Sequence, residues 1–351
     1  MTRTAIDPAD LAACREAIRT GSYSFHAASR LLPAKVRDPA LALYAFCRLA
    51  DDAVDEGCDK VGAVLSLRDR LDLVYGGRPQ NAAADRAFAA VVAAYDMPRA
   101  LPDALLEGFA WDAANRRYDT FDQLCGYGAR VASAVGAMMC VLMGVRGADA
   151  LARACDLGLA MQLTNIARDI GTDAREGRFY VPSAWADEMG LDEAAILNAA
   201  QSPSAPPDPR LTAITQRLLD QADLLYLRAD AGIPALPLAS RPAIFAARHI
   251  YAGIGGAIAR VGHHALHTRA HTSKGQKLGW LALSGLRAAT SIVLPSPARL
   301  HARPHPEVAF LVDAAADARA QTRRSDALFA VLAQLEAQDR GLPLGNRGRA
   351  A

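Results

Sequence analysis

The sequence predicts an all-α protein, and three observations carry that prediction. Ala, Leu and Arg dominate the composition, runs of β-branched residues are rare, and apolar residues recur every three or four positions rather than every second one. Apolar residues make up 52% of the 351 residues and charged residues 22%, which is enough for a large buried core and excludes a disordered chain.

The expected helices follow one another along the chain, separated by turn residues. Gly76-Gly77-Arg78-Pro79 separates two of them, and four prolines lie between Gln201 and Pro209. The helical pattern resumes directly after this proline-rich segment, which favours a surface loop over a domain linker. Helices are expected over 8–19, 38–56, 61–75, 84–95, 102–114, 121–142, 147–170, 183–188, 192–199, 209–228, 236–261, 276–292 and 307–337. We expect one all-α domain over residues 1–300 and a C-terminal helical extension with a polar tail over 301–351.

The charges and cysteines narrow the class of protein. There are 39 Lys+Arg against 37 Asp+Glu, a formal net charge of +2, so no nucleic-acid partner is expected. The six cysteines are scattered without a CxxC, which indicates reduced thiols in a cytoplasmic protein. No apolar run is long enough for a transmembrane helix. The nearest, 278–294, favours a buried core helix, with an apolar membrane-contact surface as the alternative.

Two acidic stripes lie on separate predicted helices. The first stripe is Tyr44, Arg48, Asp51 and Asp55, and the second is Gln162, Asn165, Asp169 and Asp173. At about 100° per residue, the four residues of each stripe fall within about 60–80° of arc around the helix axis, so each stripe forms one helix face. A single Asp pair four residues apart is most often a solvated helix face, but both pairs here lie in apolar sequence.

Carboxylates held that close in a partly buried groove repel each other by about 4 kcal/mol at 4 Å and an effective dielectric of 20. A divalent cation would neutralise them. Asp carboxylates with Asn165 as a neutral ligand suit a hard ion, and the absence of Cys and His from the stripes argues against zinc. Two facing stripes therefore predict a diphosphate held through metal. Arg48 and Arg168 either contact phosphate oxygens or form intrahelical salt bridges.

The two Asp-x-x-x-Asp motifs, in the contexts 44–55 and 162–182, resemble the squalene/phytoene synthase family, and more closely its bacterial phytoene synthases. Further resemblance lies in Gly21–Arg30 and in Tyr127–Gly136, and it covers about residues 15–290. The second motif, with its Gln162, its Asn165 and the Gly-Arg-x-Tyr-x-Pro that follows, is the specific one.

The resemblance implies an isoprenoid-synthase helical fold with a central active-site cavity. It also implies head-to-head condensation of two geranylgeranyl diphosphates through prephytoene diphosphate to phytoene, as in carotenoid biosynthesis, with Mg²⁺ or Mn²⁺ and without NADPH. By this resemblance the metal ligands are Asp51, Asp55, Asn165, Asp169 and Asp173. The residues that contact diphosphate or the reacting allyl unit are Ser22, Ser24, Tyr44, Arg48, Tyr127, Gln162, Arg168 and Tyr251. Asp51, Asp55, Asp169, Asp173, Tyr127 and Arg48 form the implied catalytic set.

Long hydrocarbon substrates and products also lead us to expect peripheral contact with the inner face of the cytoplasmic membrane, and they leave contact with downstream carotenoid enzymes open. The allylic cation needs π-faces, and Tyr23, Phe25, Tyr44 and Phe46 crowd near the first stripe, where ordinary core packing is the alternative.

The chain departs from the family after Arg260, where His263-His264 replaces the usual Tyr-Asp. His263, His267 and His271 are spaced at i,i+4, but no acid completes a metal motif, so a solvated basic face with Arg269, Lys274 and Lys277 is favoured. Two other functions remain open. One is a squalene or dehydrosqualene synthase that uses farnesyl diphosphate, and the other is a non-catalytic lipid-binding or assembly module.

Overall fold

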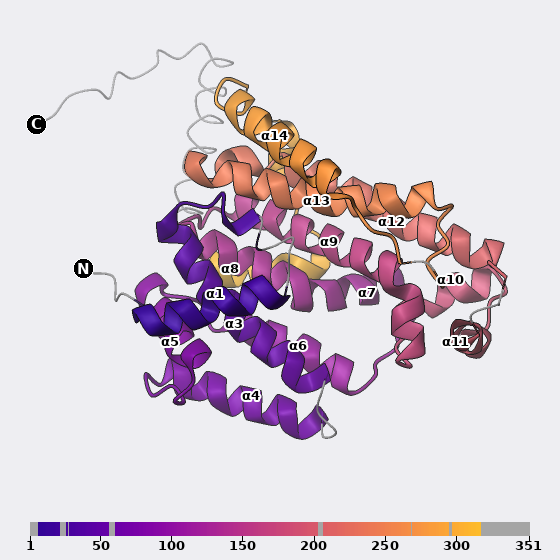
Figure 1. Cartoon of the computed structure of the whole chain (residues 1–351), viewed down its shortest axis with the longest axis horizontal. Helices are drawn as coiled ribbons and strands as arrows, with labels where there is room; N and C mark the ends of the chain where they lie inside the picture. The colour runs from indigo at the N-terminus through magenta and orange to yellow at the C-terminus, as the bar shows by residue number, and fades with distance from the viewer. Residues whose placement is uncertain are drawn as a thin grey trace, which may run out of the picture.

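The computed structural model describes residues 6–21, 26, 28–55, 60–202, 206–267, 269–294 and 297–316, and of residues 50–55 it describes the backbone alone. Within these ranges every regular element is a helix and none is a strand (Figure 1). The prediction of an all-α fold is confirmed.

The first helices are α1 (Pro8–Gly21), α3 (Ala34–Asp55), α4 (Lys60–Tyr75), α5 (Ala83–Tyr95) and α6 (Ala100–Ala113). Helix α3 begins four residues earlier than the expected start at 38, although Pro39 lies inside it. Proline has no N–H for the carbonyl one turn back. The Tyr95 hydroxyl donates to that carbonyl, of Lys35, at 3.0 Å, which compensates for the missing helical bond.

The expected helix 121–142 is interrupted by a π-helical turn. It consists of α7 (Phe121–Gly128), the π-turn η1 (Ala129–Ser133) and α8 (Ala134–Leu142). By length and composition this run could cross a membrane, yet 61% of its apolar window is buried inside the protein. Burial of that extent is typical of the core helix of a globular protein.

Helix α9 (Ala148–Arg175) extends beyond the expected end at 170, so the whole second stripe is helical. It runs through the middle of the molecule, between α12 and α13 on one side and α8 and η1 on the other (Figure 1). The crossing with η1 is close enough to require Gly158, because a Cβ there would lie 2.6 Å from the carbonyl oxygen of Ala132.

The remaining elements are α10 (Ser183–Glu188), α11 (Glu193–Gln201), α12 (Pro209–Asp230), the 3₁₀ turns η2 (Ile233–Ala235) and η3 (Leu238–Ser240), α13 (Arg241–Arg260), α14 (Lys274–Thr290), η4 (Ala298–His301), η5 (Pro306–Val308) and α15 (Ala309–Ala315). The expectation of one helix over 236–261 was wrong at its start. Pro234 and Pro237 lack the N–H groups that would continue a helix, and α13 begins only at Arg241.

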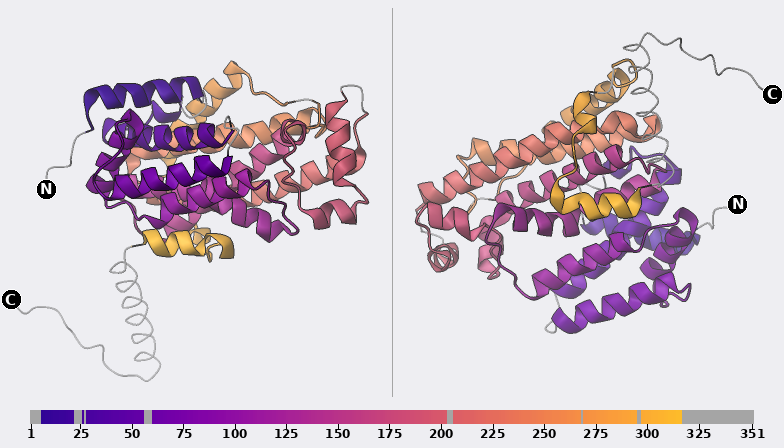
Figure 2. Two further views of the ribbon diagram at one scale, coloured as in Figure 1. Left: turned by 90° about the horizontal axis from the view of Figure 1, so that it is seen from below. Right: turned by 180° about the vertical axis from the view of Figure 1, so that it is seen from behind.

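Helix α15 packs against α6, α8 and α9, on the side of the molecule that Figure 2 shows from behind. The described part of the predicted C-terminal extension therefore lies on the core. The expectation of one helix over 307–337 was wrong, because α15 covers only Ala309–Ala315 and Ala316 is extended. Residues from 317 onward fall outside the described residues, and the domain boundary at 300 stays a prediction.

Candidate active site

The second stripe lies along one face of α9 and includes a buried amide oxygen that no described residue bonds. The amide oxygen of Asn165 is buried, and it has no hydrogen-bond partner among the described residues. A buried acceptor normally has one, because leaving it unpaired costs about 1–3 kcal/mol. Asn165 thus offers a free oxygen beside Asp169, one helical turn away.

Asp169 is compensated by two guanidinium groups. Arg168 donates to it from Nε at 2.9 Å and also from Nη2, and Arg269 donates from Nε at 2.7 Å and from Nη2 at 3.4 Å. Burial acts to raise the pKa of Asp169, but these hydrogen bonds outweigh it and hold the pKa below its usual value. Of the two roles left open for Arg168, the structure shows the ion pair.

Arg269 reaches Asp169 because the chain after α13 crosses α9 at Gly171. A Cβ at Gly171 would lie 1.8 Å from the carbonyl oxygen of Leu266, so only glycine allows the crossing. The Gly171 N–H donates to the Ala265 carbonyl at 3.3 Å. The glycine between the two aspartates of the motif therefore brings a residue 100 positions away into the site.

Arg269 is exposed, as predicted for a solvated basic face, but its ion pair with Asp169 was not predicted. The spacing of His263, His267 and His271 is also not helical, because α13 ends at Arg260 and turns follow it. Their i,i+4 separation therefore places them on no common helix face.

The negative charge of Asp173 is not compensated by arginine hydrogen bonds of the kind that Asp169 accepts. Burial raises its pKa from 3.8 to about 7, and the negative charge of Asp169 adds to the effect, while Arg178 opposes it. A carboxylate with so high a pKa is short of nearby positive charge. Ionised Asp173 would be stabilised by a cation entering the site.

The first stripe lies on the C-terminal half of α3, which extends to Asp55 as expected. Tyr44 packs against the end of α1, where a Cβ at Gly21 would lie 2.4 Å from its hydroxyl. The side chains of Asp51 and Asp55 are not described, and Ser22, Ser24, Tyr23 and Phe25 lie outside the described residues. Their roles stay predictions.

Tyr251 on α13 lies near both motifs. Burial raises its pKa to about 12, Arg168 opposes the shift, and the neighbouring Tyr44 and Asp169 add to it. Side chains from α3, α9 and α13 therefore approach one another here. Gln162 lies on α9 where α7 packs closely, since a Cβ at Gly128 would be 3.9 Å from its side chain.

Tyr127 belongs to a cluster around Asp112. Its hydroxyl donates to Asp112 Oδ2 at 3.0 Å, and the Tyr180 hydroxyl donates to Oδ1 at 2.8 Å. The two rings stack with centroids 5.1 Å apart, and the Tyr118 ring lies 5.4 Å from that of Tyr127. Burial, with the charge of Asp112 adding to it, raises the pKa of Tyr127. This phenol is therefore neutral at physiological pH.

Phe46, in contrast, belongs to the core. It is fully buried and stacks on Phe88 with ring centroids 4.4 Å apart, so core packing was the correct alternative for this residue.

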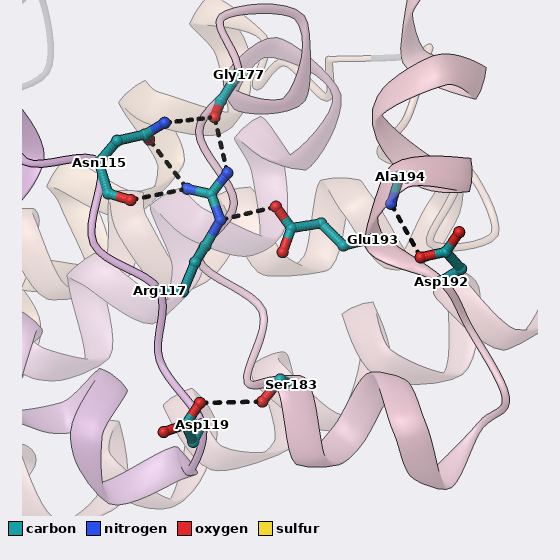
Figure 3. A network of polar contacts seen from close by, with 8 residues as sticks. All are labelled: Asn115, Arg117, Asp119, Gly177, Ser183, Asp192, Glu193 and Ala194. Atoms are coloured by element: carbon teal, nitrogen blue, oxygen red, sulfur yellow. Dashed lines mark hydrogen bonds and ion pairs between the residues drawn. The ribbon is translucent and has the colours of Figure 1, made fainter.

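A polar network fixes the loop that carries Tyr180 (Figure 3). Arg117 donates from Nη2 to the Gly177 carbonyl at 3.0 Å, from Nε to Glu193 at 2.7 Å, and from Nη1 to the Asn115 side chain at 2.9 Å. Further along, Ser183 donates to Asp119 at 3.3 Å. The segment after α9 is thereby tied to the segment before α7 at both ends, which sets Tyr180 beside Tyr127.

The sequence profile of the squalene/phytoene synthase family matches residues 18–276 of this chain. The chain belongs to the squalene/phytoene synthase family. It is 64% identical to the phytoene synthase of Cereibacter sphaeroides over 97% of this chain and 99% of that protein. It is 57% identical to the phytoene synthase of Rhodobacter capsulatus, with the same coverage. A dehydrosqualene synthase solved with a ligand is 29% identical and has a TM-score of 0.73, over 80% of this chain and 97% of that one.

The second motif identifies α9 in the sequence, but the residues that surround it come from other helices. Asp112, Tyr118 and Tyr180 were missed as site residues. Tyr180 lies in the Gly-Arg-x-Tyr-x-Pro segment that marks the family, and that context was its one signal. Asp112 sits near the end of α6, and its two tyrosine partners come from other parts of the chain, so the local sequence pattern does not identify it.

Among the side chains that the structure describes, no three His, Cys, Asp or Glu residues gather closely enough to hold a metal ion. That set does not include Asp51 and Asp55, which are half of the predicted carboxylates. The four-carboxylate site and the central cavity therefore stay predictions.

Proposed function

We propose that this protein is a phytoene synthase, a transferase of carotenoid biosynthesis. It condenses two geranylgeranyl diphosphates head to head, through prephytoene diphosphate, to phytoene, and it releases two diphosphates. The observation that carries the proposal is the identity of 64% with a phytoene synthase over nearly the whole chain. The arrangement of Asp169, Asp173 and Arg269 around the second motif is consistent with binding an anionic substrate.

We further propose that Asp51, Asp55, Asn165, Asp169 and Asp173 hold Mg²⁺ or Mn²⁺. Two features of the second stripe fit such an ion: the amide oxygen of Asn165 has no hydrogen-bond partner among the described residues, and Asp173 is short of positive charge. Oxygen ligands of this kind suit a hard divalent cation. The ion would draw charge from the departing diphosphate and so favour cleavage of the allylic C–O bond.

The arginines of the site supply direct contacts to diphosphate oxygens. Arg168 and Arg269 each use Nε and Nη2 on Asp169, and Nη1 takes no part in either pair. A guanidinium oriented by a carboxylate can donate its remaining N–H groups to phosphate. Arg48, Ser22, Ser24, Tyr44, Gln162 and Tyr251 complete the proposed set of substrate contacts.

The tyrosine cluster suits the carbocation that forms after ionisation. Asp112 accepts hydrogen bonds from both Tyr127 and Tyr180, which holds the two hydroxyl protons in fixed positions. A neutral phenol offers its π-face to a cation but is too weak a base to remove a proton from it early. Tyr127 would therefore stabilise the cation until it rearranges.

The main competing function is a squalene or dehydrosqualene synthase, and the relative of known structure with 29% identity is a dehydrosqualene synthase. A five-carbon isoprene unit contributes about 4 kcal/mol at about 0.8 kcal/mol per buried carbon, so a pocket for the fourth unit discriminates strongly between substrates. We expect the twenty-carbon diphosphate to be preferred over the fifteen-carbon one.

The test is product identification with the purified full chain, Mg²⁺ and each diphosphate, with and without NADPH. The proposal requires phytoene from the twenty-carbon substrate, without reductant, and loss of turnover on exhaustive chelation. A main product of NADPH-dependent squalene, or of dehydrosqualene from farnesyl diphosphate, would assign the chain to the competing function. Lipid binding with no product from either substrate would instead indicate the non-catalytic module.

We also propose that the protein works at the cytoplasmic face of the membrane as a peripheral protein. Its proposed substrate and product are long hydrocarbons that partition into the bilayer. Downstream carotenoid enzymes would meet the product there.

A further inference from the structure

Helix α14 turns its apolar side away from the protein. Its inner side packs on α13, where His249 Nδ1 lies 3.0 Å from Ser284 Oγ and Ala288 is buried. At about 100° per residue, Leu278 lies about 100° round the helix from this inner side, and Leu286 lies opposite it. They are 68% and 63% exposed. A surface helix of a globular protein normally shows the reverse pattern, with its polar side outward.

The outer side of α14 is without charge along its length. The exposed residues on this side are Leu278, Gly279, Ala282, Leu283, Gly285, Leu286, Ala289 and Thr290. The apolar surface continues into the turn after the helix, where Val293 is 81% exposed and lies between exposed Ile292 and Leu294. The segment 278–294 is therefore not the buried core helix that the sequence favoured. A continuous exposed apolar surface of this kind marks an interaction site.

Positive charge borders the apolar side on both margins. Lys274 lies along one margin and Arg287 along the other, and Lys277 lies near the N-terminal end of the helix on its inner side. Neither lysine makes an ion pair with any residue that the structure describes. Residues 231–306 contain no Asp or Glu. Their nine basic residues are Arg241, Arg248, Arg260, Arg269, Lys274, Lys277, Arg287, Arg299 and Arg303.

We propose that α14 and the turn after it, residues 274–294 and here named the α14 surface, dock on an anionic phospholipid bilayer. The helix lies in the plane of the interface, with its leucines among the acyl chains and its lysines at the headgroups. The inference deepens the proposed function, because a bilayer is where such a synthase meets its hydrocarbon substrate and product. A second copy of the chain is a poorer occupant, since it would bring like charges together, whereas anionic lipid neutralises them.

The experiment measures sedimentation of the purified full chain with vesicles. One set is phosphatidylcholine with about one third phosphatidylglycerol, and the other is phosphatidylcholine alone. The natural chain should bind the anionic vesicles and bind the neutral ones weakly. Because each exposed leucine is worth about tenfold in partitioning, Leu278→Asp with Leu286→Asp should weaken binding about 100-fold.

The matched control is Leu224→Asp, a leucine that is 57% exposed on a different helix, α12. It should bind vesicles like the natural chain, and circular dichroism melting should show all variants folded. Equal binding by the control and the double variant would overturn the proposal. Failure of the natural chain to bind the anionic vesicles would also overturn the proposal. So would a double variant that binds vesicles normally and has lost only its self-association in analytical ultracentrifugation.

Turnover in detergent separates this proposal from the proposed function. The double variant should keep the turnover of the natural chain with detergent-dispersed substrate, because its substitutions lie outside the site. A chain that binds vesicles through the α14 surface but makes no phytoene would contradict the proposed function and leave the docking surface standing.

Discussion

Replacing Asp173 by Asn separates what this carboxylate does to stability from what it does for catalysis. In the metal-free protein burial raises its pKa to about 7, against 3.8 for the ordinary group. Asn keeps the shape of the side chain and removes the charge. We therefore expect the variant to be more stable than the natural chain when no metal is bound, and to be nearly inactive.

The size of the effect follows from the pKa shift. The folded protein binds the Asp173 proton more tightly than the unfolded chain does, so this group lowers the free energy of unfolding as the pH rises from about 4 to about 7. At 1.36 kcal/mol per pKa unit, the full loss is at most about 4 kcal/mol. The stability advantage of Asp173→Asn should therefore grow from about 2 kcal/mol at pH 5 to about 4 kcal/mol at pH 8, where it raises the Tm by roughly 5 °C.

The assay is thermal melting at pH 5 and pH 8, with chelator and then with Mg²⁺, and phytoene formation is measured in parallel. Mg²⁺ should raise the Tm of the natural chain more than that of the variant, and turnover of the variant should fall at least about 10²-fold. Asp69→Asn, an exposed change within α4, is the control and should shift neither property. A Tm difference that does not vary with pH, or a variant with full turnover, would refute the reasoning.

Three further predictions concern the surroundings of the site. Gly171→Ala places a Cβ against the Leu266 carbonyl, so melting should show a loss of about 2–4 kcal/mol and kinetics a raised KM as Arg269 is displaced from Asp169. Asp112→Asn removes the charged acceptor of two tyrosine hydroxyls, and steady-state kinetics should show kcat reduced about 10–100-fold with KM little changed. Burial lowers the pKa of His249 to about 4, so stability should fall by at most about 3 kcal/mol between about pH 6.5 and pH 4, and melting of His249→Gln should show a smaller fall.

Local patterns in the sequence predicted the helices and the two acidic faces. A period of 3.6 residues and the turn residues between periodic segments are local properties, and they gave α4, α5, α10 and α12 with ends close to those observed. The predicted helix ends were wrong near prolines, because a proline can lie inside a helix or can prevent one. Pro39 lies inside α3 because Tyr95 replaces the lost hydrogen bond, whereas Pro234 and Pro237 prevent a helix before α13.

The polar partners of the site could not be predicted, because they come from distant parts of the chain. Nothing near Arg269 in the sequence identifies Asp169 as its partner, and the composition around it resembles a solvated surface. The same holds for Asp112, whose two hydrogen bonds come from residues 15 and 68 positions later. A pattern along one helix reports which side is polar, but it does not report which residue of another helix lies opposite.

The two aspartates of the second motif have the same chemistry and opposite surroundings. Asp169 has two arginines within hydrogen-bond distance, and they compensate its charge. Asp173, one turn later, has a pKa near neutrality, so its ionisation depends on what enters the site. Asn165 likewise keeps an oxygen without a hydrogen-bond partner among the described residues. The stripe thus combines one carboxylate whose charge two arginines compensate with a second carboxylate and an amide oxygen that have no such partners among the described residues.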